Sequence, residues 1–287
     1  MSDQPKTEST LANLRAYTPA RIALARAGSS ITTRDTLDFA LAHAQARDAV
    51  HAALSLPTLL AELHARHLPI LTVQSAAPDR PTYIRRPDLG RTLSAASRAL
   101  LASHAPTSPT AFPQLTIILA DGLSALATDR HSIPLLDTLL PLLHLAPPLS
   151  TPNHSDSPAV PDRPEAPAHP AWHLTPIILA EQARVALGDE IGLALGSSLT
   201  LMLLGERPGL SAADSLGAYL TWAPAPGRTD AQRNCVSNIR TGGLDPAAAA
   251  QRIAFYIHEA RRLSLTGTAL KDPTPQALQL THAKEKA

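Results

Sequence analysis

The chain has 287 residues, of which 44% are hydrophobic and 3% aromatic, the size of one large domain or two modest ones. Its formal net charge of +1 gives no field that would attract nucleic acid or a membrane surface, and no run of about 18 apolar residues predicts a membrane span. The single cysteine excludes an intramolecular disulfide. Because no secretory signal opens the sequence, we expect a cytoplasmic protein.

The first 110 residues are predicted to form an arm and a mainly helical region. We expect residues 1–30 to be an N-terminal arm, partly disordered, because they begin with a polar stretch and carry only short apolar pieces around Pro19. Thr32 or Thr33 can cap the helix that follows. The elements predicted for the mainly helical region, residues 31–110, are a helix to about Leu54, a helix over 57–67, a strand over 68–75 with 80–86 as its partner, and a helix over 89–103.

Short continuous apolar runs alternate with helical segments beyond residue 110. Such runs are typical of buried parallel strands, and their alternation with helices predicts an α/β fold with a Rossmann-like, largely parallel sheet flanked by helices. Asp245 suits the N-cap of the last helix and Pro246 its first position. The α/β domain is expected over 111–287, with strands at 114–121, 174–180, 199–204 and 218–223 and helices at 131–145, 181–196 and 245–262.

A proline-rich stretch, residues 147–170, interrupts the α/β pattern. Proline has no backbone N–H to donate, so this stretch cannot build a regular element. We predict a flexible or polyproline-like surface insertion there.

Two loops leave the predicted strands with unusual chemistry. Ligands of open parallel sheets bind beyond the carboxyl ends of the strands, where this sequence has residues 121–124 and 205–210. Glu206 supplies an acceptor and Arg207 a fork of donors. The alternative is a structural turn in which Glu206 and Arg207 satisfy each other or cap a helix. Together with 185–189 and 233–239, these loops predict a small-molecule or cofactor site.

Other reactive residues give weaker signals. Cys235 is expected to be an inert thiol rather than a nucleophile, since no histidine base is indicated near it. His64 and His67 are interpreted as surface residues, because no metal-binding motif surrounds them. Asp189 and Glu190 are adjacent on a helix and therefore do not face each other as a pair.

Several sequence blocks, in this order, resemble the small subunit (light chain) of ethanolamine ammonia-lyase. They are YIRRPDLGRTL (83–93), LADGLSALA (119–127), RVALGDEIG (184–192), LGERPGL (204–210) and DSLGAYLTWAPAPGRTDAQRNCVSNIR (214–240). A sixth block, residues 18–51, precedes them, and the blocks span most of the chain. The proline-rich stretch departs from the pattern, because the family has a shorter link there.

The resemblance implies a subunit that helps to bind adenosylcobalamin at its interface with a large subunit. In that family the large subunit binds ethanolamine and performs the radical chemistry that yields acetaldehyde and ammonia. By motif, the cofactor contacts fall on Val185, Glu206 and Cys235. The resemblance further implies a hetero-oligomer that is inactive without the large subunit, in the cytoplasm or inside a bacterial microcompartment.

The resemblance also bears on the cobalt ligand. The family is similar to enzymes that keep the benzimidazole base of the cofactor on cobalt, and the DxHxxG motif of base-off enzymes is absent, so His131 is not assigned to the metal. The alternative function is a non-catalytic α/β binding or scaffold protein that has lost the cofactor. A hydrolase that uses Cys235 is a third hypothesis.

Overall fold

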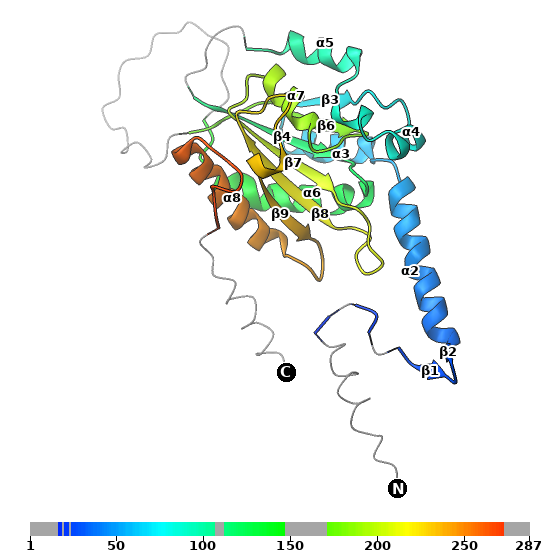
Figure 1. Cartoon of the computed structure of the whole chain (residues 1–287). Helices are drawn as coiled ribbons and strands as arrows, with labels where there is room; N and C mark the ends of the chain where they lie inside the picture. Colours follow the sequence, from blue (N-terminus) through cyan, green and yellow to red (C-terminus); the bar gives the residue numbers. More distant parts are fainter. Residues whose placement is uncertain (1–16, 19, 23, 107–111, 147–170, 273–287) are drawn as a thin grey trace, which may run out of the picture.

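The chain has a mixed α/β fold built around one central sheet (Figure 1). The computed structural model describes residues 17–18, 20–22, 24–106, 112–146 and 171–272. The order across the sheet is β3-β6-β4-β7-β8-β9, with the short β5 beside β4. The strands are β3 (Ile70–Gln74), β4 (Gln114–Ala120), β5 (His173–Leu174), β6 (Ile177–Glu181), β7 (Leu199–Gly205), β8 (Leu216–Trp222) and β9 (Arg233–Ile239).

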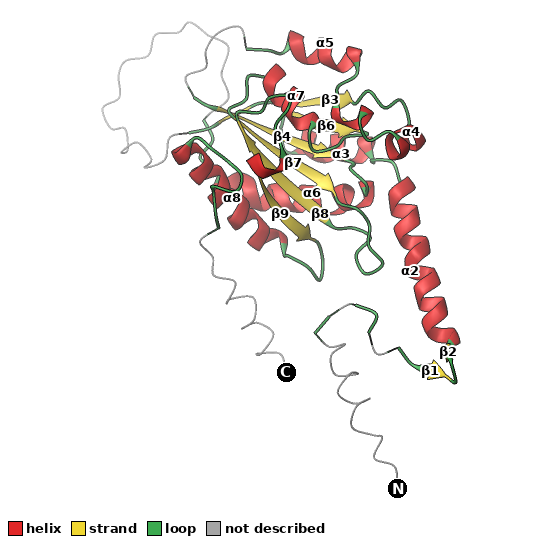
Figure 2. Cartoon of the chain, in the orientation of Figure 1, coloured by secondary structure: helices red, strands yellow, loops and turns green. Residues whose placement is uncertain are grey.

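Helices surround the sheet (Figure 2), and most begin at a side-chain cap. Thr32 Oγ1 accepts the Asp35 N–H at the start of α2, and Asp245 Oδ2 accepts the Ala247 N–H at the start of α8, as predicted. The helices are α2 (Thr33–His51), α3 (Leu56–Ala65), α4 (Arg80–Arg85), α5 (Ala95–Ser103), α6 (Ala125–Leu139), α7 (Leu187–Ala194) and α8 (Pro246–Leu263). A small hairpin, β1 (Arg26–Ala27) with β2 (Ser30–Ile31), precedes α2.

The sheet is parallel only in part. Strands β3, β6, β4 and β7 are parallel to one another, which the sequence predicts for β4, β6 and β7. β8 is antiparallel to β7, and β9 is antiparallel to β8. Residues 206–215, which join β7 to β8, contain no helix, and a connection without a crossover returns the chain antiparallel. β9 itself corrects the prediction, which treated 233–239 as a loop.

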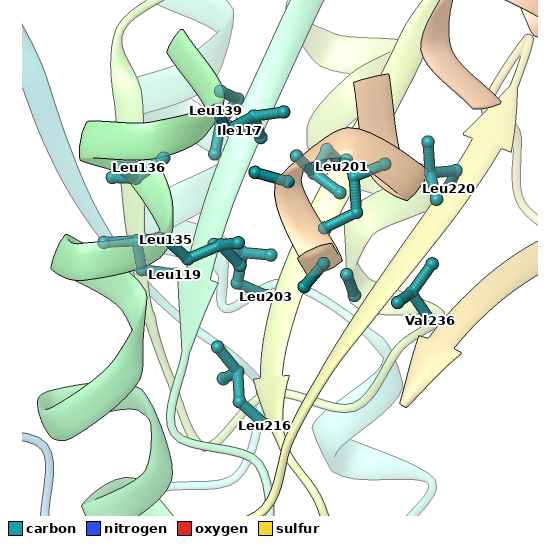
Figure 3. Packing of buried hydrophobic residues seen from close by; sticks show 14 of the residues in the cluster. Ile117, Leu119, Leu135, Leu136, Leu139, Leu201, Leu203, Leu216, Leu220 and Val236 are labelled. Carbon is teal, nitrogen blue, oxygen red and sulfur yellow. The ribbon is translucent and has the colours of Figure 1, made fainter. Parts of the chain in front are cut away.

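Alternate side chains of the central strands feed two separate cores. Leu115, Ile117 and Leu119 of β4 belong to a core with α3, α6 and α8, whereas Ile118 and Ala120 belong to a second core with α5 and α7. This is the period-two alternation of a strand, and it places the sheet between two helical layers. Figure 3 shows the first core, where α6 packs against β4 and β7.

The segment predicted as the strand partner of 68–75 is a helix. Residues 80–85 fold as α4 because Asp79 Oδ1 accepts the Thr82 N–H at 2.7 Å and Pro81 occupies the first turn. β3 instead pairs with β6, so a strand from the predicted N-terminal region lies in the central sheet. The domain boundary near residue 110 and the Rossmann-like winding stay predictions.

Four further elements differ from prediction. The run 174–180 divides into β5 and β6 around Pro176, and the helix predicted over 131–145 begins already at Ala125, with Ser124 as its cap. The helix predicted over 181–196 begins only at Leu187. Helix 89–103 is replaced by a short 3-10 turn, Leu89–Arg91, followed by α5.

Helix α2 extends away from the sheet (Figure 1). Only Ala42 and Ala49 of its described side chains are buried, and Leu37, Phe39 and Leu41 are exposed. The proline-rich stretch 147–170 and most of the predicted arm lie outside the described residues. In the part of the chain that the structure describes, no helix combines the length and apolarity that crossing a membrane requires.

Candidate functional site

The carboxyl ends of the parallel strands meet at one edge of the sheet. β6 ends at Glu181, β4 at Ala120 and β7 at Gly205, and the antiparallel β8 begins there at Leu216. The loops predicted from the sequence at 121–124, 185–189 and 205–210 all follow these ends. The fold therefore confirms that these three segments are neighbours.

Asp121 ties two of these loops together. Its carboxylate accepts the Gln182 N–H at 2.9 Å and the Ala183 N–H at 3.0 Å, and it pairs with Arg80 at 3.1 Å. Burial raises the pKa of Asp121 to about 6, although the Ala183 N–H and Arg80 oppose that rise. Because Asp121 occupies two N–H groups of residues 182–183, the chain turns here and α7 starts later than predicted.

The turn after β4 packs directly against the end of β7. The Leu123 N–H donates to the Gly205 carbonyl at 2.9 Å. A Cβ at Gly205 would collide with the Ser124 carbonyl oxygen, and Gly122, at φ +54°, faces the Gly205 carbonyl. Glycine at both positions lets the two backbones touch. This contact fixes where Glu206 leaves the sheet.

Glu206 is half-buried and held by its neighbours in the sheet. Its Oε2 accepts from the Ser215 hydroxyl at 2.5 Å and from the Asn238 N–H at 3.4 Å. No donor among the described residues bonds its Oε1, which would lie 2.8 Å from a Cβ at Gly217. The carboxylate is thus fixed by one oxygen while the other is available as an acceptor.

Arg184 and Val185 also line the site. The Arg184 guanidinium lies 4.4 Å from the centroid of the Tyr83 ring, and the Tyr83 hydroxyl donates to the Ala183 carbonyl at 2.8 Å. Gly90 makes this stack possible, because a Cβ there would lie 2.8 Å from the Tyr83 ring. Val185 is half-buried in the turn before α7.

Cys235 lies in the middle of β9, opposite Tyr219 of β8. It is exposed at the surface, and both Tyr219 and Cys235 point to the α7 side of the sheet, the side opposite Ala218 and Val236 of the first core. Desolvation by the surrounding protein raises the pKa of its thiol to about 11, the Glu206 carboxylate adds to the rise, and a hydrogen bond with Tyr219 opposes it. The thiol is therefore neutral near pH 7.

One pocket brings the predicted residues together. The pocket, called here the Glu206 pocket, has a volume of about 450 Å³ and is lined by both Val185 and Glu206, with Tyr83, Arg184 and Tyr219 among its other walls. Cys235 does not line this pocket, but its thiol bonds Tyr219, which does. The fold thus places all three predicted residues around Tyr219 and the end of β7.

Sequence reasoning missed Tyr83, Arg184 and Tyr219. Tyr83 lies in a segment predicted as a strand. Arg184 lies in the block RVALG and Tyr219 in the block LGAYL, and no further motif marks either residue. An arginine or tyrosine directly next to a predicted contact residue would have been the available signal.

The other candidate side chains have structural roles or are exposed. Asp189 forms a buried ion pair with Arg233, and Glu190 accepts the Leu93 N–H and pairs with Arg98. His64 and His67 are exposed, as predicted. Asp189 and Glu190 thus point to different partners, in agreement with the sequence reading.

Comparison with known proteins bears on this site. A family model described as the ethanolamine ammonia-lyase light chain matches residues 8–152 and 157–271. The chain belongs to this family. A protein of Bradyrhizobium diazoefficiens named ethanolamine ammonia-lyase small subunit is 48% identical over 272 residues, 95% of this chain and 94% of that protein.

Two further relatives carry the same name. The protein of Azotobacter vinelandii is 48% identical over 274 residues, 95% of this chain and 92% of its own length. That of Pseudomonas fluorescens (strain Pf0-1) is 46% identical over 259 residues, 90% and 85% of the two chains. Membership of this family identifies the chain as a component of a lyase complex that also contains a large subunit.

Proposed function

We propose that this chain, on its Rossmann-like sheet, helps to bind adenosylcobalamin at the interface with the large subunit of ethanolamine ammonia-lyase. The observation that carries the proposal is the Glu206 pocket, where Val185 and Glu206 meet beside Tyr219 and Cys235. Two residues that the family resemblance selected by motif, far apart in the sequence, line one hollow, and the third, Cys235, bonds Tyr219 in its wall. Family membership supports the rest of the assignment.

The residues present fit this cofactor. Cobalamin carries uncharged amide side chains around its ring, and the Oε1 of Glu206 is an acceptor for an amide N–H or a hydroxyl. Val185 offers apolar surface, and Cys235 offers a neutral thiol on an exposed strand face. On this face of β9, α7 contacts the start of the strand through the Asp189–Arg233 ion pair, whereas Cys235 and Ser237 further along are exposed and leave room for a ligand.

The division of work follows from the residues of this chain. When bound, adenosylcobalamin supplies an organic radical by homolysis of its cobalt–carbon bond, and that chemistry belongs to the cofactor. Val185, Glu206 and Cys235 bind and orient one side of it. The large subunit binds ethanolamine and completes the site, so the isolated chain is inactive. The complex acts in the cytoplasm, free or inside a bacterial microcompartment.

A cobalamin titration of the reconstituted two-subunit complex, read by visible absorbance, tests the proposal. Glu206→Ala removes a charge-assisted acceptor and should weaken binding by about 1.5–3 kcal/mol. Glu206→Gln keeps one neutral acceptor and should weaken it less. Glu259→Gln on α8, the helix that packs on the opposite face of the sheet, is the matched control. Unchanged affinity of Glu206→Ala would remove Glu206 from the site.

The same titration separates the alternatives. A wild-type complex that binds no cobalamin would indicate a scaffold that has lost the cofactor. Ammonia release from ethanolamine by the isolated chain would contradict the proposed division of work between subunits. The hydrolase hypothesis is disfavoured already, because a nucleophilic cysteine needs a lowered pKa and that of Cys235 is raised.

A further inference from the structure

We propose that Arg184 binds the phosphodiester in the nucleotide tail of the cofactor, as a further cofactor-binding residue of this chain. The inference rests on the proposed function. The structure supports it with an arginine that has no acceptor, a rigid support for that arginine, and a hollow of positive charge.

Arg184 has donors without acceptors. Its Nε is buried and has no hydrogen-bond partner, and no carboxylate of the described residues pairs with its guanidinium. A buried arginine donor left unpaired costs free energy. The neighbouring Arg80 also has one buried donor without a partner, Nη2, but its charge is neutralised by Asp121 and it donates to the Val50 and Gly122 carbonyls. Arg184 is therefore a charge at this edge with a buried donor and no carboxylate partner among the described residues.

The guanidinium is oriented before any ligand arrives. Tyr83 supports its face at 4.4 Å, and the ring is in turn fixed by its bond to the Ala183 carbonyl. The backbone N–H of Arg184 donates to the Gly90 carbonyl at 2.8 Å. A planar fork held in this way loses little conformational entropy when it binds an oxyanion.

The charges around Arg184 select an anion. A second hollow, called here the basic hollow, has a volume of about 530 Å³ and adjoins the Glu206 pocket, with which it shares Arg184, Arg207 and Leu123. Arg47, His43, Arg184 and Arg207 line it, and none of its lining residues is an aspartate or glutamate. Such a site favours a negative group.

The phosphodiester is the peripheral group of cobalamin that carries a negative charge, whereas the ring substituents are amides. A ligand that contacts Val185 and Glu206 in the Glu206 pocket can therefore place its single oxyanion next to Arg184. Free inorganic phosphate shares this chemistry, so the experiment must distinguish the two sources.

The test compares two ligands on the reconstituted complex. Adenosylcobalamin contains the phosphodiester, and adenosylcobinamide lacks it together with the benzimidazole. Arg184→Gln should weaken adenosylcobalamin binding about tenfold or more and leave cobinamide binding unchanged, as read by visible absorbance. Arg85→Gln, an exposed change on the same helix as Tyr83, is the control for lost charge and should weaken neither.

A second variant and a competition experiment with inorganic phosphate complete the test. Arg207→Gln, at the exposed side of both hollows, should show the same ligand selectivity with a smaller effect, which covers the case that Arg184→Gln fails to fold. Millimolar inorganic phosphate should compete with adenosylcobalamin only weakly; phosphate binding that leaves cobalamin affinity untouched would assign the hollow to free phosphate and overturn the proposal.

Other results would also overturn it. Equal weakening of both ligands, or no weakening of either, contradicts a contact with the phosphodiester. A variant complex that dissociates, with unchanged cofactor affinity in the fraction that remains, would assign Arg184 to the subunit contact. If the wild-type complex bound neither ligand, the proposed function itself would fail, so the two failures are distinguishable.

Discussion

Replacing Arg233 by methionine should destabilise the chain because it strands a buried carboxylate. Arg233 Nη1 and Nη2 bond the two oxygens of Asp189 at 2.7 and 2.6 Å, and the side chains are 4% and 2% exposed. Arg233 also donates to Thr221 Oγ1 at 2.7 Å and to the Arg228 carbonyl at 2.9 Å. This arginine thus connects the start of β9 to α7.

The magnitude follows from what each variant leaves behind. Removing one partner of a buried ion pair costs about 3–5 kcal/mol. Asp189 lies in the first turn of α7, where the helix dipole favours a carboxylate by about 0.3–1 kcal/mol, so we expect about 3 kcal/mol for Arg233→Met. Asp189→Leu should cost a similar amount, since it strands the arginine. The double variant leaves no unpaired charge and should be far more stable than the sum of the two losses.

Urea unfolding of the full chain measures all three variants against wild type. The midpoint should fall for each single variant without a change in slope. Arg86→Met is the control, because Arg86 bonds Asp88 at 2.9 and 2.7 Å in the same two-pronged way but at the surface, and its midpoint should stay near wild type. Additive losses in the double variant would refute the reasoning, since no coupling between the two charges would then exist.

Two further predictions concern the site itself. Gly205→Ala should lower the free energy of unfolding by at least about 2 kcal/mol, because its Cβ would meet the Ser124 carbonyl; Gly209→Ala, whose Cβ would lie 3.8 Å from the nearest carbonyl oxygen, should be near neutral in the same urea experiment. Alkylation of Cys235, the single cysteine, should titrate with an apparent pKa of about 11, well above the ~8.5 of a free thiol. Glu206→Gln should lower that pKa and speed alkylation at pH 8, since the Glu206 charge disfavours the thiolate. An apparent pKa near that of a free thiol in the wild-type chain would contradict the argument that the surrounding protein and the Glu206 charge disfavour the thiolate.

The elements that the sequence predicts well are those whose burial is one-sided or complete. β4 and β7 are predominantly apolar, and every residue of both is buried, so their hydrophobicity marks them. α8 has a cap, a first-turn proline and one apolar face that includes Ile253 and Ile257, so periodicity marks it. In these segments local pattern and tertiary burial agree.

β9 was not predicted because some of its buried side chains are polar. Arg233 and Asn234 are buried while Cys235 and Ser237 are exposed, so no apolar alternation is visible. Asn234 is satisfied by the Gly267 N–H at 2.8 Å and the Leu270 carbonyl at 2.8 Å, far along the chain. The hydrogen bonds that allow Asn234 to be buried are tertiary contacts, which the local sequence does not reveal. The antiparallel return of β8 and β9 was missed with it.

The wrong prediction at residues 80–86 had a larger consequence, because it concealed how Arg80 and Tyr83 contact the loops of the candidate site. In a strand, Arg80 and Tyr83 would point to opposite faces; in α4 they are three residues apart and share one face. From that face Arg80 reaches Asp121 of the β4 loop, and Tyr83 reaches Ala183 of the β6 loop and supports Arg184. α4 therefore clamps the two loops beside the Glu206 pocket. The motif identified Val185. The helical spacing of α4 places Tyr83 under the preceding residue, Arg184, and so fixes the direction of its guanidinium.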